Sequence, residues 1–150
     1  MSPESRAIRR SRRVCGAFFV GAGMLHFARP RTFEQIVPPG FGDPRTLVVL
    51  SGAAEIVGGV SLALPDARWF SRWWLTGLLV AVFPANVYMA LDPGTTGSFG
   101  LPRWLLWVRL PLQGAGIWWV WKITSDKLRV QLPYEPALPP PAGDVGKLTR

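Results

Sequence analysis

The sequence predicts an all-α fold: an integral membrane bundle of four transmembrane helices with both termini in the cytoplasm. Hydrophobic residues make up 49% of the 150 residues and charged residues only 17%, which is apolar for one domain of this length. The hydrophobic residues form four blocks, at 14–28, 47–64, 73–91 and 101–123, and most of the charge lies outside them. A soluble four-helix bundle would carry a charged face on every helix, which these blocks lack.

A basic segment, residues 1–13, precedes the first block. Its arginines stand where the positive-inside rule places cytoplasmic charge: Arg6, Arg9, Arg10, Arg12 and Arg13. We therefore interpret the net charge of +8 as a topology signal and expect no nucleic-acid partner. Because the sequence around Ala28 and Arg29 is a poor cleavage site, we expect residues 14–28 to remain as the first transmembrane helix.

Residues 29–46 connect the first two blocks. Prolines at 38, 39 and 44 and glycines at 40 and 42 interrupt this connector too often for a helix, so we expect a loop. Its apolar side chains give it enough surface to lie over the end of the bundle as a lid: Phe33, Ile36, Val37 and Phe41.

The second block, residues 47–64, carries its small residues on one helical face. That face contains Glu55 together with Ser51, Gly52, Gly58 and Gly59. Small residues let helices approach closely in lipid, so we expect this face to pack inward and to direct Glu55 into the bundle. The connector to the third block is short, which predicts that these two helices are antiparallel neighbours.

The third block, residues 73–91, contains two features of helix packing. Gly77 and Ala81 have the four-residue spacing of a helix contact. Pro84 removes one backbone hydrogen bond and opens a kink, so that Asn86 can bond across helices.

The fourth block, residues 101–123, carries Arg109, Pro111 and Gln113 in an apolar run that is long enough to span a bilayer. About 20 residues at about 1.5 Å each cross about 30 Å of hydrocarbon. A guanidinium at this depth costs at least a few kcal/mol unless it faces protein, water or a counter-ion. Pro111 is expected to bend the helix beside Arg109. Residues 124–150 form a polar, proline-rich tail that we place in the cytoplasm.

Basic residues and tryptophans predict the same orientation. Ten lysines and arginines lie near the helix ends assigned to the cytoplasm, whereas four lie at the opposite ends: Arg29, Arg31, Arg45 and Arg103. Six tryptophans form a belt at the cytoplasmic end, and Trp104 and Trp107 mark the other.

Five polar residues from the four blocks are predicted to meet in the outer half of the bundle. At about 1.5 Å per residue, Glu55 and Arg109 both lie about 12 Å from the outer end, Asn86 about 8 Å and His26 about 3 Å. We expect an ion pair between Glu55 and Arg109. With Asn86, Gln113 and His26, this pair is either a structural clasp or an outward-facing pocket for a polar head group such as a quinone.

Cysteine and histidine usage bounds the chemistry. The single Cys15 excludes an internal disulfide and a CxxC redox pair, and we expect it to pack inertly. The single His26 excludes bis-histidine haem ligation, and we expect no metal site. Redox chemistry would therefore need a bound cofactor or a partner protein.

Four motifs resemble the DoxX family of small four-helix bacterial membrane proteins. They are G-x-x-H-F-x-x-P at residues 23–30, S-G-x-x-E-I-x-G-G at 51–59, V-F-P-A-N-x-Y-M-A at 82–90 and R-L-P-L-Q at 109–113. The resemblance covers residues 14–123 and implies a multi-pass protein of the bacterial inner membrane. It also implies an accessory subunit that supports redox enzymes, with a redox enzyme or a second copy of the chain as partner, and we expect it to bind a quinone or a similar lipophilic molecule.

Two other functions stay open at this point. The same polar pocket could serve a small-molecule carrier or channel, and the chain could instead be a membrane scaffold without chemistry. The residues do not decide whether the chain is an enzyme; they favour a protein that is not an enzyme on its own.

Overall fold

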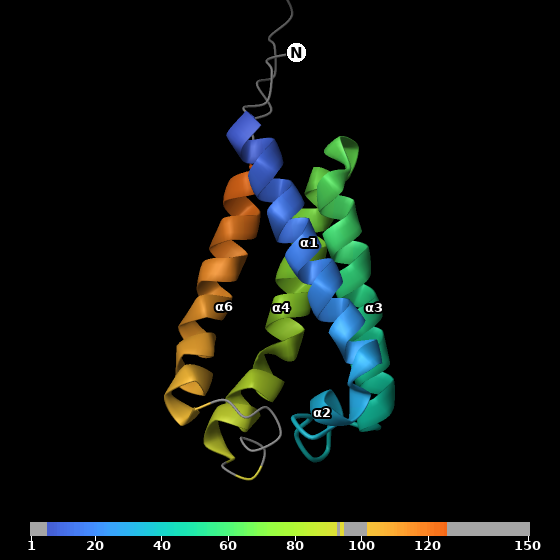
Figure 1. The fold of residues 1–150 in the computed structure, drawn as a ribbon, viewed down its shortest axis with the longest axis vertical. Coiled ribbons are helices and arrows are strands. Elements are labelled where there is room, and N and C mark those ends of the chain that lie inside the picture. Colours follow the sequence, from blue (N-terminus) through green and yellow to red (C-terminus); the bar gives the residue numbers. More distant parts are fainter. Residues whose placement is uncertain (1–5, 93, 95–101, 126–150) are drawn as a thin grey trace, which may run out of the picture.

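The computed structural model describes residues 6–92, 94 and 102–125. Every regular element in these ranges is a helix, which confirms the all-α fold (Figure 1). The long helices are α1 (Arg6–Ala28), α3 (Pro44–Ala63), α4 (Arg68–Leu91) and α6 (Arg103–Thr124), and the short ones are α2 (Pro30–Glu34) and the 3₁₀ helix η1 (Pro65–Ala67). Residues 1–5 of the basic segment and nearly all of the proline-rich tail lie outside the described residues.

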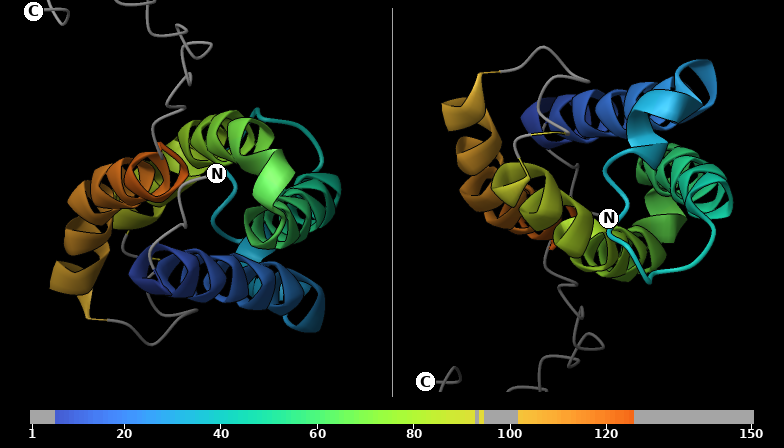
Figure 2. Two further views of the ribbon diagram at one scale, coloured as in Figure 1. Left: turned by 90° about the horizontal axis from the view of Figure 1, so that it is seen from above. Right: turned by 90° about the horizontal axis from the view of Figure 1, so that it is seen from below.

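The long helices form a ring in the order α1, α3, α4, α6, as Figure 2 shows from both ends. α1 packs most extensively on α3, and α4 on α6, so the bundle consists of two helix pairs. The start of α1 and the end of α6 lie at the same end of the bundle, where Trp119 Nε1 donates to Ser11 Oγ at 2.9 Å. The antiparallel neighbours predicted for the second and third blocks are α3 and α4, where Ser71 Oγ donates to Ser61 Oγ at 2.8 Å.

Two helical stretches are long and apolar enough to cross a membrane. They are α3 and the continuous stretch Pro65–Leu91, in which η1 leads into α4. Among the described residues, α1 and α6 do not pass the same test. α1 contains the arginines of the basic segment, and α6 contains Arg103, Arg109 and Lys122.

Two helices, α1 and α4, begin well before their apolar blocks do. α1 starts at Arg6 and α4 at Arg68, because arginine is a good helix former and no breaker separates these residues from the apolar runs. The basic segment from Arg6 onward is therefore the first part of α1. Arg12 is only 4% exposed there.

The connector between α1 and α3 closes one end of the bundle. Its first part is α2, a five-residue helix with Pro30 in its first turn, so the expectation of a loop throughout was wrong here. Further on, Gly40 and Gly42 adopt φ values of 90° and 112°, which side-chain-bearing residues rarely reach. Ile36 is buried against Met89 and Leu106, so the connector rests on α4 and α6.

Asp43 caps the N-terminus of α3. Its carboxylate accepts hydrogen bonds from the Thr46 backbone N–H at 2.8 Å and from Thr46 Oγ1 at 2.6 Å. These side-chain and backbone hydrogen bonds hold the pKa of Asp43 below its ordinary value of 3.8. The cap fixes where the connector ends and α3 begins.

We expect Asp43→Ala to lower the thermal unfolding midpoint at pH 7, because two hydrogen bonds at the helix start are lost. A carboxyl with a lowered folded-state pKa stabilises the fold above its unfolded-state pKa, and this contribution is lost as the pH falls through the folded-state value. The difference between wild type and variant should therefore narrow below pH 3.8. Asp43→Asn, which keeps a capping oxygen, serves as the control, and a difference independent of pH would contradict the assignment.

Two glycine pairs bring the backbones of α1 and α3 together. A Cβ placed on Gly16 would lie 2.6 Å from the Gly59 carbonyl oxygen, and one on Gly23 would lie 2.5 Å from that of Gly52. Both distances are far inside van der Waals contact, so only glycine fits. The pairs lie seven residues apart on each helix, which is two turns of one face. This confirms that the small residues of the second block pack inward.

The spacing of Gly77 and Ala81 does not mark a helix contact. A Cβ on Gly77 would meet nothing within 4 Å, so Gly77 touches no neighbouring helix, and Ala81 lines the cavity described below. The close contact of α4 with α3 lies instead at Gly58, which receives the Leu75 side chain.

Candidate functional site

A cavity of about 760 Å³ lies between the two helix pairs. One core cluster, including Cys15, Phe19 and Val120, closes the bundle near the start of α1, and the cluster around Ile36 and Met89 closes it near α2. The cavity wall is mostly apolar and draws on α1, α3, α4, α6 and the connector. All five polar residues singled out from the sequence line it: His26, Glu55, Asn86, Arg109 and Gln113.

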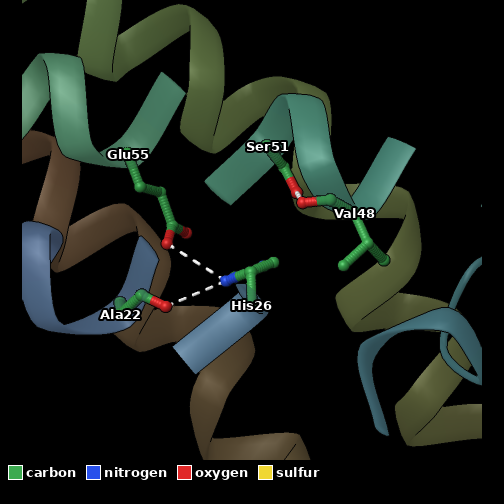
Figure 3. A network of polar contacts seen from close by, with 5 residues as sticks. All are labelled: Ala22, His26, Val48, Ser51 and Glu55. Carbon is green, nitrogen blue, oxygen red and sulfur yellow. Dashed lines mark hydrogen bonds and ion pairs between the residues drawn. The ribbon is translucent and has the colours of Figure 1, made fainter. Parts of the chain in front are cut away.

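His26 and Glu55 form one corner of the cavity (Figure 3). His26 Nδ1 donates to the Ala22 carbonyl oxygen at 2.9 Å, since a carbonyl can only accept, and the same nitrogen lies 3.4 Å from Glu55 Oε2. The two side chains are 12% and 14% exposed. Glu55 Oε2 is buried and accepts no hydrogen bond from any described residue. Glu55 Oε2 is therefore a buried acceptor, in an apolar wall, that can still accept a hydrogen bond from a ligand.

Arg109 faces the cavity from α6. Its guanidinium makes no hydrogen bond to the described residues and no direct salt bridge to Glu55, whose carboxylate contacts His26. The charges of Glu55 and Arg109 nevertheless attract each other across the cavity, so the two groups interact electrostatically without forming a close pair. The two charged groups still share the cavity. Glu55 supplies an acceptor and Arg109 supplies donors from the opposite helix pair.

Asn86 and Gln113 join α4 to α6. Asn86 Nδ2 donates to Gln113 Oε1 at 3.0 Å, and Gln113 Nε2 donates to the Leu79 carbonyl oxygen. Asn86 therefore bonds across helices, as its position after Pro84 predicted. Gln113 is only 8% exposed, so its amide depends on these two partners.

We expect Gln113→Leu to destabilise the protein by about 1–3 kcal/mol, because the Asn86 amide loses its partner inside the bundle. The double variant Asn86→Leu/Gln113→Leu removes both polar groups and should recover part of that loss. Unfolding midpoints followed by tryptophan fluorescence in detergent would complete the double-mutant cycle. Additive effects of the two single variants would contradict a direct bridge.

Three parts of the site could not be read from the sequence. The Phe33 ring of α2 stacks on His26 with 3.9 Å between ring centroids, and it thereby fixes the imidazole. Trp119 lines the cavity although its position suggested an interfacial belt. The Leu79 carbonyl that anchors Gln113 is a backbone group, which residue identity does not reveal.

The described residues contain no group of three or more histidine, cysteine, aspartate or glutamate side chains that could hold a metal ion. Cys15 is buried in the apolar cluster at the start of α1, away from the cavity lining. The arrangement is therefore an apolar chamber with a small number of hydrogen-bonding groups at one level, which is the usual composition of a small-molecule site.

Residues 15–124 match a protein family described as "Domain of unknown function (DUF8561)". The match spans all four long helices and the cavity between them. Comparison with curated proteins and with solved structures gave no match.

Proposed function

Because the chain belongs to the DUF8561 family, whose description assigns no activity, we propose its function from the cavity: it is a multi-pass membrane protein that binds a small lipophilic molecule with a polar head of the quinone type. One observation carries the proposal. Glu55 and Arg109 line the same apolar cavity, and each lacks a hydrogen-bond partner at its cavity-facing group among the described residues.

The outer surface supports membrane embedding for all four long helices. Large apolar side chains face outward on α1 and α6 as well as on α3 and α4; on α1 and α6, Met24 is 60% exposed and Val108 39%, and neither lines the cavity. Water would penalise such a surface, whereas lipid accepts it. Tryptophans near the end that holds Ser11 and Trp119 contact basic groups, with Arg72 over Trp121 and Lys122 over Trp118, as is typical of a headgroup layer. We place this end and both termini in the cytoplasm, in agreement with the basic residues.

The chemistry of the cavity suits a quinone in both of its redox forms. A quinone carbonyl accepts hydrogen bonds, which the Arg109 guanidinium supplies, and a hydroquinone O–H donates one, which Glu55 Oε2 can accept. The volume lies within the range of about 300–1,000 Å³ that holds small organic ligands. The aromatic rings of Phe19, Phe33 and Trp119 provide a lining for a flat ring.

The resemblance to the DoxX family leads us to propose that the bound molecule serves a partner redox enzyme. The motif residues Gly23, Gly52 and Gly59 lie at the contact of α1 and α3, and those of the polar set line the cavity. In this proposal the chain is an accessory subunit that holds the ligand, and the partner carries out the chemistry.

Ligand binding can be tested on the purified full-length protein. We expect organic extracts of the protein to contain a quinone, and we expect decylubiquinone added to extracted protein to quench its tryptophan fluorescence saturably. Trp119→Phe is the control, because it removes the tryptophan in the cavity wall and should reduce the quenching. The absence of both co-extracted quinone and saturable quenching would overturn the proposal.

A further inference from the structure

We infer that the ligand's apolar tail lies in the seam between α1 and α6 and reaches the lipid there. This inference rests on the proposed function and extends it, because it assigns the ligand class as a quinone with an extended tail and names the side of the bundle through which it passes. The seam consists of Phe18, Ala22 and Leu25 on α1 and Leu112, Gly116 and Trp119 on α6, all of which line the cavity.

α1 and α6 meet at one end and then diverge. They are joined where Trp119 donates to Ser11, and Cys15 and Phe19 pack in the same cluster as Val120 and Ile123. Toward α2, α1 crosses onto α3, held by Gly23 against Gly52, and α6 stays with α4 (Figure 1). The contact between α1 and α6 is consequently slight compared with that of any other neighbouring pair of long helices.

The other sides of the cavity are held by specific contacts. Trp74 Nε1 donates to the Ala54 carbonyl oxygen at 2.9 Å, which ties α4 to α3 at the level of the cavity. The connector packs Ile36 against α4 and α6 at the α2 end. The bonds of Gln113 tie α4 to α6. The side between α1 and α6 has no comparable bridge among the described residues at this level.

The seam has the surface that a lipid tail requires. Its positions on each helix follow helical spacing, so each set forms one continuous apolar stripe. Phe18, Leu25 and Leu112 are each more than half exposed, so the stripes reach the outside of the bundle. A Cβ on Gly116 would find its nearest atom, Leu79 Cδ1, 4.0 Å away, so open space lies beside this glycine.

The seam continues directly from the polar groups. Gly116 lies two turns from Arg109, which is about 10 Å along α6 at about 1.5 Å per residue. Ser11 stands opposite Trp119, so seven residues further along each helix Phe18 lies at about the level of Leu112. A head group held between Glu55 and Arg109 would thus direct its tail between Phe18 and Leu112.

The test compares two quinones in three variants, with binding measured by fluorescence titration of full-length protein in detergent. Gly116→Phe fills the seam, Ala81→Phe adds a ring to the α4 wall of the cavity, and Gly114→Phe adds the same ring to α6 outside the cavity. We expect Gly116→Phe to lower the affinity for decylubiquinone at least about tenfold, because excluding two methylene groups of the tail from an apolar surface lowers affinity by about that factor. Ubiquinone-0, which has no tail, should lose far less affinity than decylubiquinone in Gly116→Phe, and Gly114→Phe should bind both quinones within about twofold of wild type.

The outcomes separate this inference from the proposed function. The tail does not lie in the seam if Gly116→Phe binds decylubiquinone as tightly as wild type, or if only Ala81→Phe loses affinity for it. Either result would still leave the cavity as a quinone site. Equal weakening by Gly114→Phe would also overturn this placement of the tail, because the effect would not come from the seam. Failure of the wild-type protein to bind either quinone would remove the proposed function and the seam together.

Discussion

Replacing Arg109 with leucine is expected to raise the stability of the ligand-free protein and to abolish its binding of decylubiquinone. The guanidinium lines an apolar cavity without a hydrogen bond to the described residues, and burial penalises its charge by more than the attraction of Glu55 offsets, so its removal relieves a net desolvation cost. The same change deletes charge-assisted hydrogen bonds to the ligand, which predicts at least about a tenfold loss of affinity.

This result would distinguish the binding site from a structural clasp. Unfolding midpoints in detergent and fluorescence titrations should be measured on the same preparations. Arg103→Leu is the matched control, because Arg103 is an exposed arginine of the same helix and should leave both quantities nearly unchanged. A collapse of stability in Arg109→Leu, with recovery in the double variant Glu55→Leu/Arg109→Leu, would support the clasp and contradict the pocket.

The second large effect is expected at the glycine contact. Alanine at Gly59 would place its Cβ 2.6 Å from the Gly16 carbonyl oxygen and 2.9 Å from the Val20 backbone nitrogen. Backbone atoms cannot turn away as a side chain can, so α1 and α3 must separate. Overpacking of this kind typically costs about 1–3 kcal/mol, and we expect Gly16→Ala to behave alike.

Gly21→Ala provides the control, because Gly21 lies on α1, the same helix as Gly16. A Cβ there would meet nothing within 4 Å, so the change should be neutral or slightly stabilising, because alanine favours a helix over glycine by about 0.5–1 kcal/mol. The comparison requires only thermal unfolding in one detergent. Equal midpoints for Gly59→Ala and Gly21→Ala would show that the two helices are not in backbone contact.

The level at which the polar residues meet could be predicted from the sequence. Antiparallel helices with a fixed rise carry Glu55, Asn86 and Arg109 to similar depths once the apolar blocks are aligned. The partners could not be predicted, because rotation about each helix axis decides them. The contact between α1 and α3 brings Glu55 next to His26, and Asn86 is hydrogen-bonded to Gln113. The N–H groups of Arg109 are therefore available to a molecule in the cavity.

The errors of sequence reasoning have the same origin. Gly77 and Ala81 have the right spacing for a helix contact, but spacing cannot say which face of a helix has a neighbour. The lid was predicted from its apolar residues, and Phe33, Val37 and Phe41 do line the cavity. The short helix within it depends on Pro30 at its start and on packing against α3, which local sequence does not reveal.

The pairing of α1 with α3 bears on how the protein is made. These helices leave the ribosome before α4 and α6, are joined by one connector and meet through their own backbones, so they can associate before α4 and α6 are synthesised. Arg109 is synthesised after Glu55 and His26 can have met. A nascent chain that ends before α6 would thus already have one complete wall of the cavity, and the synthesis of α6 would complete the chamber.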